Sequence, residues 1–115
     1  MGIQIFGTKK SADTRKAERF FKERGIKYQY IDVNEKGLSR GEFQAVVQAA
    51  GGIDAVIDKS AKDKNTLTLL EYLSLEDKIE KTFENQSLLL LPIVRNGKYA
   101  AVGYQPEKWK TIPVK

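Results

Sequence analysis

The segment from Gly2 to Val33 constrains the fold most, because it reads as a strand, a helix and a second strand. Ile3 to Phe6 is short and apolar, which is typical of a buried strand. Ser11 is a good N-cap residue for the helix, and Gly25 stands where such a helix would end. Two strands joined through a helix are expected to be parallel with a right-handed crossover, which predicts an α/β fold.

The middle of the chain predicts several helices. Ser39 and Glu42 match a capping box, so a helix is expected to run from there to about Ala49 or Ala50. A short helical turn is expected between Ile53 and Asn65, followed by a short helix over Thr66 to Tyr72. A further helix is expected to start at Ser74. Its predicted apolar face consists of Leu75, Ile79 and Phe83.

The end of the chain predicts a β-hairpin and a closing helix. Asn96-Gly97 between two apolar runs is a strong hairpin signal. Gln105 to Ile112 is expected to be helical, with Trp109 and Ile112 as its packing residues. The predicted order is therefore β-α-β, a helical insert at about 39–87, and β-β-α. We expect residues 1–115 to form a single domain.

The absence of cysteine and histidine excludes several kinds of chemistry. Disulfides, thiol catalysis, cysteine and histidine zinc sites, and a histidine general base are all ruled out. A carboxylate site for magnesium or calcium is the metal site that this composition leaves open. The acidic residues are scattered and form no calcium-loop motif, so we expect no metal and no cofactor.

The net charge of +5 favours anionic partners without choosing among them. The basic residues are spread over several predicted elements and match no nucleic-acid motif, so no direct nucleic-acid binding is expected. Core or cleft packing is expected for four tyrosines, namely Tyr28, Tyr30, Tyr99 and Tyr104. The longest apolar run, Leu88 to Val94, falls far short of the roughly 20 residues that span a bilayer. With no signal-peptide pattern at the start, we expect a cytoplasmic protein without membrane contact.

Two longer stretches resemble the ArsC/Spx family. They are "TRKAERFFKERGIKYQYIDV", which starts at Thr14, and "LPIVRNGKYAAVGYQPEKWKTI", which starts at Leu91. The resemblance covers nearly the whole chain, and its "VGY" is closer to the Spx-like branch than to the arsenate reductases. It implies a thioredoxin-like or glutaredoxin-like fold of bacterial type, with a mixed four-stranded sheet and flanking helices.

Under this resemblance, Ser11 and Thr14 stand at the two cysteine positions of the family active site. An aliphatic hydroxyl is far less acidic than a thiol and cannot cycle through a disulfide, so no catalytic residue is expected. Lys9 or Lys10 acting as a base for Ser11 is an open alternative, but we favour Ser11 as a helix cap.

Under the same resemblance, the oxyanion-binding arginines of the arsenate reductases are also replaced. Their positions correspond here to Leu91, to Asp58 in the insert, and to Val102-Gly103 on the last strand. Arsenate reduction is therefore not expected. Pro92 matches the family proline that follows a cis peptide bond beside the active-site loop, and the resemblance implies the same cis bond here.

Three functions follow as hypotheses. The first is a redox-inactive member that binds a protein, such as the C-terminal domain of the RNA polymerase α subunit that Spx-like regulators contact. The second is a reductase that uses glutathione or another external thiol. The third is a binder of a small anion or thiol ligand. Asp13 lies in the same loop and would weaken anion binding. The candidate binding residues are Thr8, Lys10, Ser11, Arg15, Leu91 and Pro92.

Overall fold

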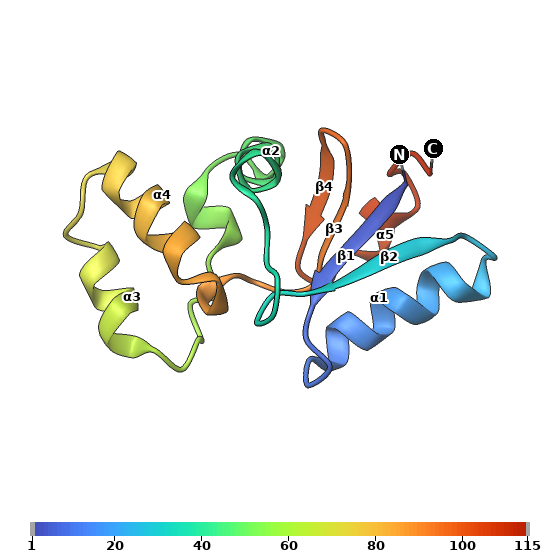
Figure 1. The fold of residues 1–115 in the computed structure, drawn as a ribbon, viewed down its shortest axis with the longest axis horizontal. Coiled ribbons are helices and arrows are strands. Elements are labelled where there is room, and N and C mark those ends of the chain that lie inside the picture. Colours follow the sequence, from blue (N-terminus) through green and yellow to red (C-terminus); the bar gives the residue numbers. More distant parts are fainter. Residues whose placement is uncertain (1, 115) are drawn as a thin grey trace.

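Four strands form one mixed sheet in the order β2-β1-β3-β4 (Figure 1). This computed structural model describes residues 2–114. β1 (Ile3–Gly7) is parallel to β2 (Tyr28–Asp32) and antiparallel to β3 (Ile93–Asn96), which pairs in turn with β4 (Tyr99–Val102). The predicted parallel pair and the predicted mixed four-stranded sheet are confirmed.

One face of the sheet is covered by α1 (Ala12–Glu23) and the short α5 (Pro106–Trp109). The predicted caps of α1 are confirmed, because Ser11 caps its start and Gly25 follows its end with a φ of 67°. The buried residues on this face are Ile3, Ile5, Ala17, Phe21, Val94, Ala101, Trp109 and Ile112. Both packing residues expected near the C-terminus, Trp109 and Ile112, therefore belong to the core.

The opposite face packs against α2 (Arg40–Ala50), whose capping box of Ser39 and Glu42 is present. η1 (Ile53–Val56), α3 (Lys64–Leu70), α4 (Leu75–Glu84) and η2 (Gln86–Leu88) complete the helical insert. α3 and α4 project away from the sheet, at the end of the molecule opposite the two termini (Figure 1). The molecule is accordingly elongated, with extents of 44 × 26 × 24 Å.

Several sequence predictions were wrong in detail. Leu75 does not join a buried face of α4, because it starts the helix at the projecting end and is 66% exposed. Asn96 is a buried residue of β3 that donates to the carbonyl of Pro113, so the two-residue turn is Gly97-Lys98. Tyr99 begins an edge strand and Tyr104 follows it, and both are about half exposed rather than packed in the core. The closing helix is also shorter than Gln105 to Ile112.

Within residues 2–114, no helix combines the length and the apolar character needed to cross a membrane.

Candidate functional site

A cleft of about 430 Å³ lies where the loop after β1 faces the helical insert and the approach to β3. Its lining residues are Thr8, Ser11, Asp13, Val33, Asn34, Asp58, Ser60, Ser87, Leu89, Leu90 and Leu91. The structure thus brings together Thr8, Ser11 and Leu91, three of the residues singled out from the sequence. It also places Asp58 with them, from a distant part of the chain.

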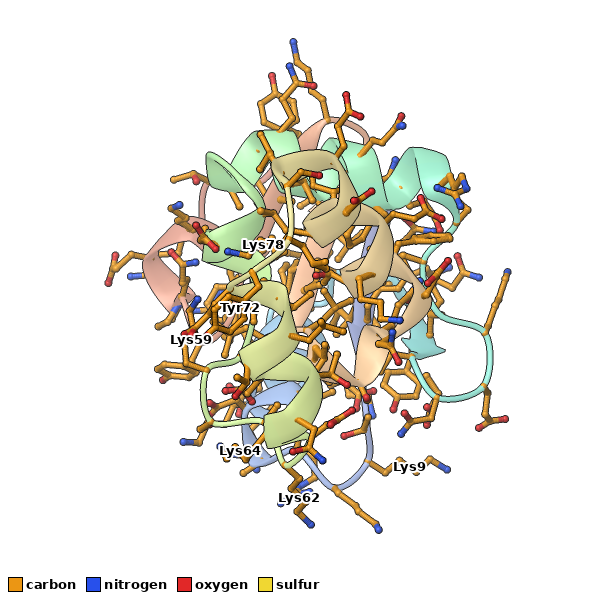
Figure 2. The ribbon with its side chains drawn as sticks, turned by 90° about the vertical axis from the view of Figure 1, so that its left-hand side faces the viewer. Lys9, Lys59, Lys62, Lys64, Tyr72 and Lys78 are labelled. Atoms are coloured by element: carbon orange, nitrogen blue, oxygen red, sulfur yellow. The ribbon has the colours of Figure 1, made fainter. Side chains whose placement is uncertain are left out.

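Ser11 is occupied as the N-cap of α1. Its Oγ accepts a hydrogen bond from the backbone N–H of Thr14 at 3.1 Å, and its own N–H donates to the carbonyl of Thr8 at 3.2 Å. None of the residues that line the cleft is lysine, arginine or histidine. Lys9 and Lys10 are exposed, and Lys9 extends outward from the ribbon (Figure 2). The Ser-Lys alternative therefore finds no lysine in this cleft.

Thr14 is a packing residue rather than part of the cleft. It is fully buried against Gly7, and a Cβ built on Gly7 would lie 2.3 Å from the Thr14 Oγ1. That hydroxyl is also buried with no hydrogen-bond partner among the described residues. A ligand in the cleft cannot contact Thr14 without moving α1 or β1. Glycine at position 7 is what gives this side chain its room.

The Leu91-Pro92 peptide bond is cis, as the resemblance implied. Pro92 is buried and is not among the cleft-lining residues, but its carbonyl accepts from the N–H of Gly103 at 2.8 Å and so holds the segment against the end of β4. Leu90 donates to the carbonyl of Val56 at 2.8 Å on the other side. Between these two anchors, Leu91 makes no backbone hydrogen bond to the described residues. Its backbone is thus available to a bound chain.

The charged residues that line the cleft are both acidic, although Asp13 is paired with Lys16 at 3.6 Å. Asp13 and Asp58 line it, and the Asp58 carboxylate accepts hydrogen bonds from the N–H and hydroxyl of Ser60 at 2.9 and 2.7 Å. The two cationic candidates lie elsewhere. Lys10 does not line the cleft, and Arg15 donates from Nη1 to the carbonyl of Lys9 at 2.6 Å. The arrangement therefore favours neutral or cationic groups over the small anions considered from the sequence.

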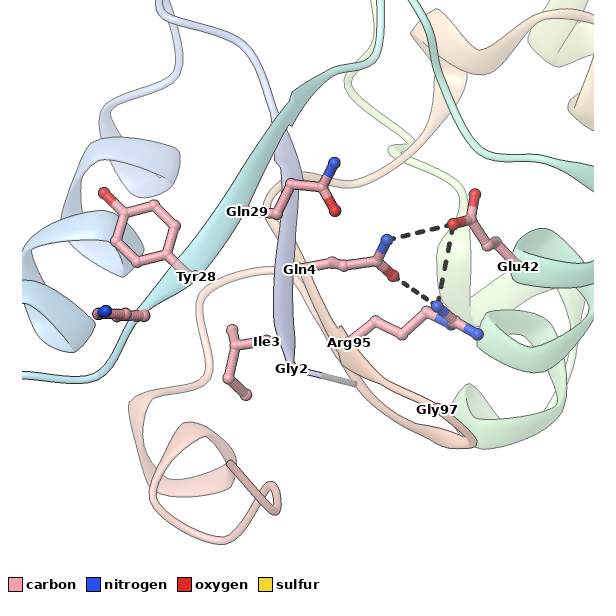
Figure 3. Close-up of a pocket in the computed structure, with 9 residues that line it drawn as sticks. Gly2, Ile3, Gln4, Tyr28, Gln29, Glu42, Arg95 and Gly97 are labelled. Atoms are coloured by element: carbon pink, nitrogen blue, oxygen red, sulfur yellow. Dashed lines mark hydrogen bonds and ion pairs between the residues drawn. The ribbon is translucent and has the colours of Figure 1, made fainter. Parts of the chain in front are cut away.

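A second hollow, of about 580 Å³, lies beside β1, β3 and α2 (Figure 3). Gln4 joins Glu42 and Arg95 there, since it donates to the Glu42 carboxylate at 3.3 Å and accepts from the Arg95 guanidinium. Burial raises the pKa of Glu42, but hydrogen bonds from Ser39 and Gln4 and the charge of Arg95 outweigh it and leave the pKa below its ordinary value. The three side chains bond mainly to each other, so we assign them to holding α2 on the sheet.

Sequence reasoning missed this triad because its members are far apart in the chain, with Gln4 and Arg95 separated by 91 positions. The only sequence signal for it was one polar residue, Gln4 or Arg95, within each of two otherwise apolar strand segments. Among residues 2–114, no cluster of three or more histidine, cysteine or acidic side chains could hold a metal ion.

Comparisons with known proteins bear on the family and the fold. The sequence profile of the ArsC family matches residues 6–112. The global transcriptional regulator Spx 2 of Oceanobacillus iheyensis is 32% identical over 109 residues, which cover 93% of this chain and 80% of that protein. An ArsC family related protein from Bacteroides fragilis superposes with a TM-score of 0.85 at 20% identity, over 98% of each chain. An arsenate reductase from Vibrio cholerae gives 0.83 at 24% identity, also over 98% of each chain. At these identities, the two structures establish the shared fold.

Proposed function

The chain belongs to the ArsC family, and we propose that it is a redox-inactive member that regulates transcription by binding a protein partner. The partner proposed is the C-terminal domain of the RNA polymerase α subunit. The observation that carries this proposal is the helix cap formed by Ser11 and Thr14, the pair that the resemblance aligns with the family thiols. The similarity to a global transcriptional regulator of the Spx type supports the regulatory role.

Without the two thiols, the chain cannot perform the thiol chemistry of the family. Its function must then depend on the surface that binds a partner. A thiol pKa near 8.5 is readily lowered at a helix N-terminus, whereas an aliphatic hydroxyl needs an adjacent base. The cleft has no histidine or lysine among its lining residues to serve as that base. Its remaining features suit a polypeptide ligand, since Leu91 offers unpaired backbone groups and the neighbouring walls offer hydroxyls and leucine side chains. A partner of this kind also implies a location in the cytoplasm.

The proposal is tested by titrating the isotope-labelled α C-terminal domain with the purified chain and following its NMR signals. We expect saturable binding that is the same before and after treating the chain with an oxidant. A Leu91→Glu variant should weaken binding, because it adds a third carboxylate to the cleft and blocks its leucine wall. Tyr99→Ser is the matched control, since Tyr99 is exposed on an edge strand and does not line the cleft.

An absence of binding to the α domain would refute the named partner. Binding that depends on the redox state would refute redox inactivity.

The family activity remains a competing assignment, namely a reductase that takes electrons from glutathione. A glutathione-coupled assay with arsenate and with a disulfide substrate checks it. We expect no turnover above the rate without protein. Turnover that disappears in Ser11→Ala would show that the hydroxyl performs chemistry, and our assignment would then fail.

A further inference from the structure

The cleft beside Ser11 is lined by charged side chains of one sign. Among its lining residues, the charged ones are Asp13 and Asp58. Each of four other hollows on the described chain combines acidic and basic side chains in its lining. The cleft is therefore the hollow in which the charge of a ligand can decide whether it binds.

Asp58 is the carboxylate of the cleft that is open to a ligand. It is partly buried, and its Oδ1 accepts two hydrogen bonds from Ser60, one from the N–H at 2.9 Å and one from the hydroxyl at 2.7 Å. These bonds hold the side chain in place and leave its Oδ2 without a partner among residues 2–114. Asp58 also takes part in no ion pair within the same residues. A cationic donor is the group that such an oxygen binds most strongly.

Several lysines lie near the cleft without lining it. Lys16 pairs with Asp13 at 3.6 Å, and Lys59, the residue after Asp58, lies 3.9 Å from the Asp54 carboxylate. Both pairs join exposed side chains, and exposed pairs of this kind are weak, so Asp13 can exchange its partner. Salt screens exposed charges beyond about 8 Å at physiological ionic strength, so the groups inside the cleft dominate its choice of ligand.

The leucine wall of the cleft adds a free edge of extended backbone. Residues 88–90 pair with residues 56–58 through two hydrogen bonds of 2.8 Å. Because alternate residues of an extended segment face opposite sides, Leu89 and Leu91 face away from residues 56–58. The Leu89 carbonyl and both backbone groups of Leu91 make no hydrogen bond to the described residues. The ligand that satisfies groups at this spacing is another extended chain.

We propose that the cleft binds an extended segment of a partner protein that carries a lysine or arginine side chain. The backbone of the segment pairs with Leu89 and Leu91, and its cationic group binds the free oxygen of Asp58. The long, flexible stem of lysine or arginine lets the charge pass the leucine side chains and reach the carboxylate. This inference rests on the proposed function, because the ligand is a protein, and it adds the chemistry by which the cleft recognises it.

The test uses three synthetic peptides of about six residues, a common strand length. Both ends are blocked so that they carry no charge, and the sequences differ only in a central lysine, norleucine or glutamate. Each peptide is titrated into the isotope-labelled full chain, and NMR shifts locate the contact. We expect the lysine peptide to bind at least about tenfold more tightly than the norleucine peptide, which corresponds to about 1.4 kcal/mol. The glutamate peptide should bind most weakly, and the shifts should centre on Asp58 and residues 89–91.

Asp58→Asn tests the carboxylate and keeps its contact with Ser60, because an amide oxygen can accept the same hydrogen bonds. The variant should bind the lysine peptide no more tightly than the norleucine peptide, with the affinity for norleucine unchanged. Glu107→Gln is the matched control. It alters an exposed carboxylate on α5, outside the cleft, and should leave the preference for lysine intact.

The backbone pairing is tested with two further lysine peptides, N-methylated at either the odd or the even positions. Methylation removes backbone donors, and alternate donors of an extended chain face opposite sides. One of the two peptides should therefore lose binding, because its methyl groups face Leu89 and Leu91, and the other should retain it. Equal binding of both would contradict the pairing.

Equal affinity for the lysine, norleucine and glutamate peptides would overturn the proposal. Failure of the lysine peptide to bind, or shifts centred away from the cleft, would do the same. These results are distinguishable from those for the α C-terminal domain. If the lysine peptide binds as expected and the α domain does not, the named partner is wrong and the recognition of a cationic segment stands. If the α domain binds equally well to Asp58→Asn and to the wild type, the partner stands and the cationic recognition is wrong.

Discussion

The hydroxyl of Ser11 accepts a hydrogen bond from the backbone N–H of Thr14 at 3.1 Å, so the two residues that the family resemblance aligns with its cysteines are joined as a helix cap. A cap satisfies one of the donors that the first turn of a helix leaves unpaired. The same N-terminal position that would activate a thiol therefore stabilises α1 in this chain. On that correspondence, a reactive position in the family is a structural one in this chain.

Replacing Ser11 by alanine should destabilise the protein by about 1 kcal/mol, because the cap hydrogen bond is lost. Urea unfolding followed by circular dichroism measures the change. Ser11→Asp should restore most of the stability, since aspartate is an equally good cap. A Ser11→Ala variant as stable as the wild type would mean that the cap contributes nothing.

A cysteine placed at position 11 and a cysteine placed at position 14 should differ in thiol reactivity. A cysteine in place of the half-buried Ser11 lies at the N-terminus of α1, so we expect its thiol pKa to fall below about 8.5. A cysteine in place of Thr14 is fully buried and should react at least about tenfold more slowly. Alkylation rates as a function of pH measure both. Equal reactivity would contradict the buried placement of Thr14.

Gly7→Ala should be strongly destabilising, because the new Cβ would lie 2.3 Å from the Oγ1 and 2.4 Å from the Cγ2 of Thr14. Overpacking of this kind typically costs about 1–3 kcal/mol. The double variant with Thr14→Ala should recover part of the loss. Gly41→Ala is the control, because that position in α2 has no atom within 4 Å of the new Cβ. A helical alanine there should stabilise by about 0.5–1 kcal/mol.

Local patterns predicted the elements that local chemistry decides. Ser11, the Ser39-Glu42 box and Gly25 mark helix ends through hydrogen bonds or dihedrals that involve only nearby residues, and the structure confirms them. The burial of Trp109 also followed from its position in an amphipathic closing segment.

The remaining features depend on where distant segments meet. Leu75 fits the apolar face of α4 by spacing, but it is 66% exposed because no described segment packs over it. Lys10 and Arg15 are close in sequence to Ser11, yet their side chains do not line the cleft. Asp58 reaches the cleft through the path of the insert, which the family resemblance indicated and periodicity did not. Burial and orientation of this kind are set by tertiary packing.

Acid should weaken the protein partly through Glu42. Its pKa is lowered in the folded state by hydrogen bonds from Ser39 and Gln4 and by Arg95, which together outweigh burial. The stabilisation is therefore full above the ordinary glutamate pKa of about 4.3 and is lost as the pH falls through the lower folded value. Unfolding by urea at a series of pH values should show a shallower acid loss for Glu42→Gln than for the wild type. Glu107→Gln, with a carboxylate 86% exposed, should leave the profile unchanged.

Placing arginines at two cleft positions should create an anion-binding site. Leu91 and Asp58 line the same cleft as Ser11, so Asp58→Arg with Leu91→Arg points two guanidinium groups at one space. We expect phosphate and arsenate to raise the melting temperature of the double variant and to leave that of the wild type unchanged. At a ligand concentration of a hundred times Kd, the gain in the free energy of unfolding is about 2.7 kcal/mol. Reduction of arsenate should still be absent, because a guanidinium clamp supplies no nucleophile. Glu107→Arg with Tyr99→Arg adds the same charge away from the cleft and should bind no anion. Equal stabilisation of the wild type would show that the cleft holds anions despite Asp13 and Asp58, and the case for a cleft that disfavours anions would fail.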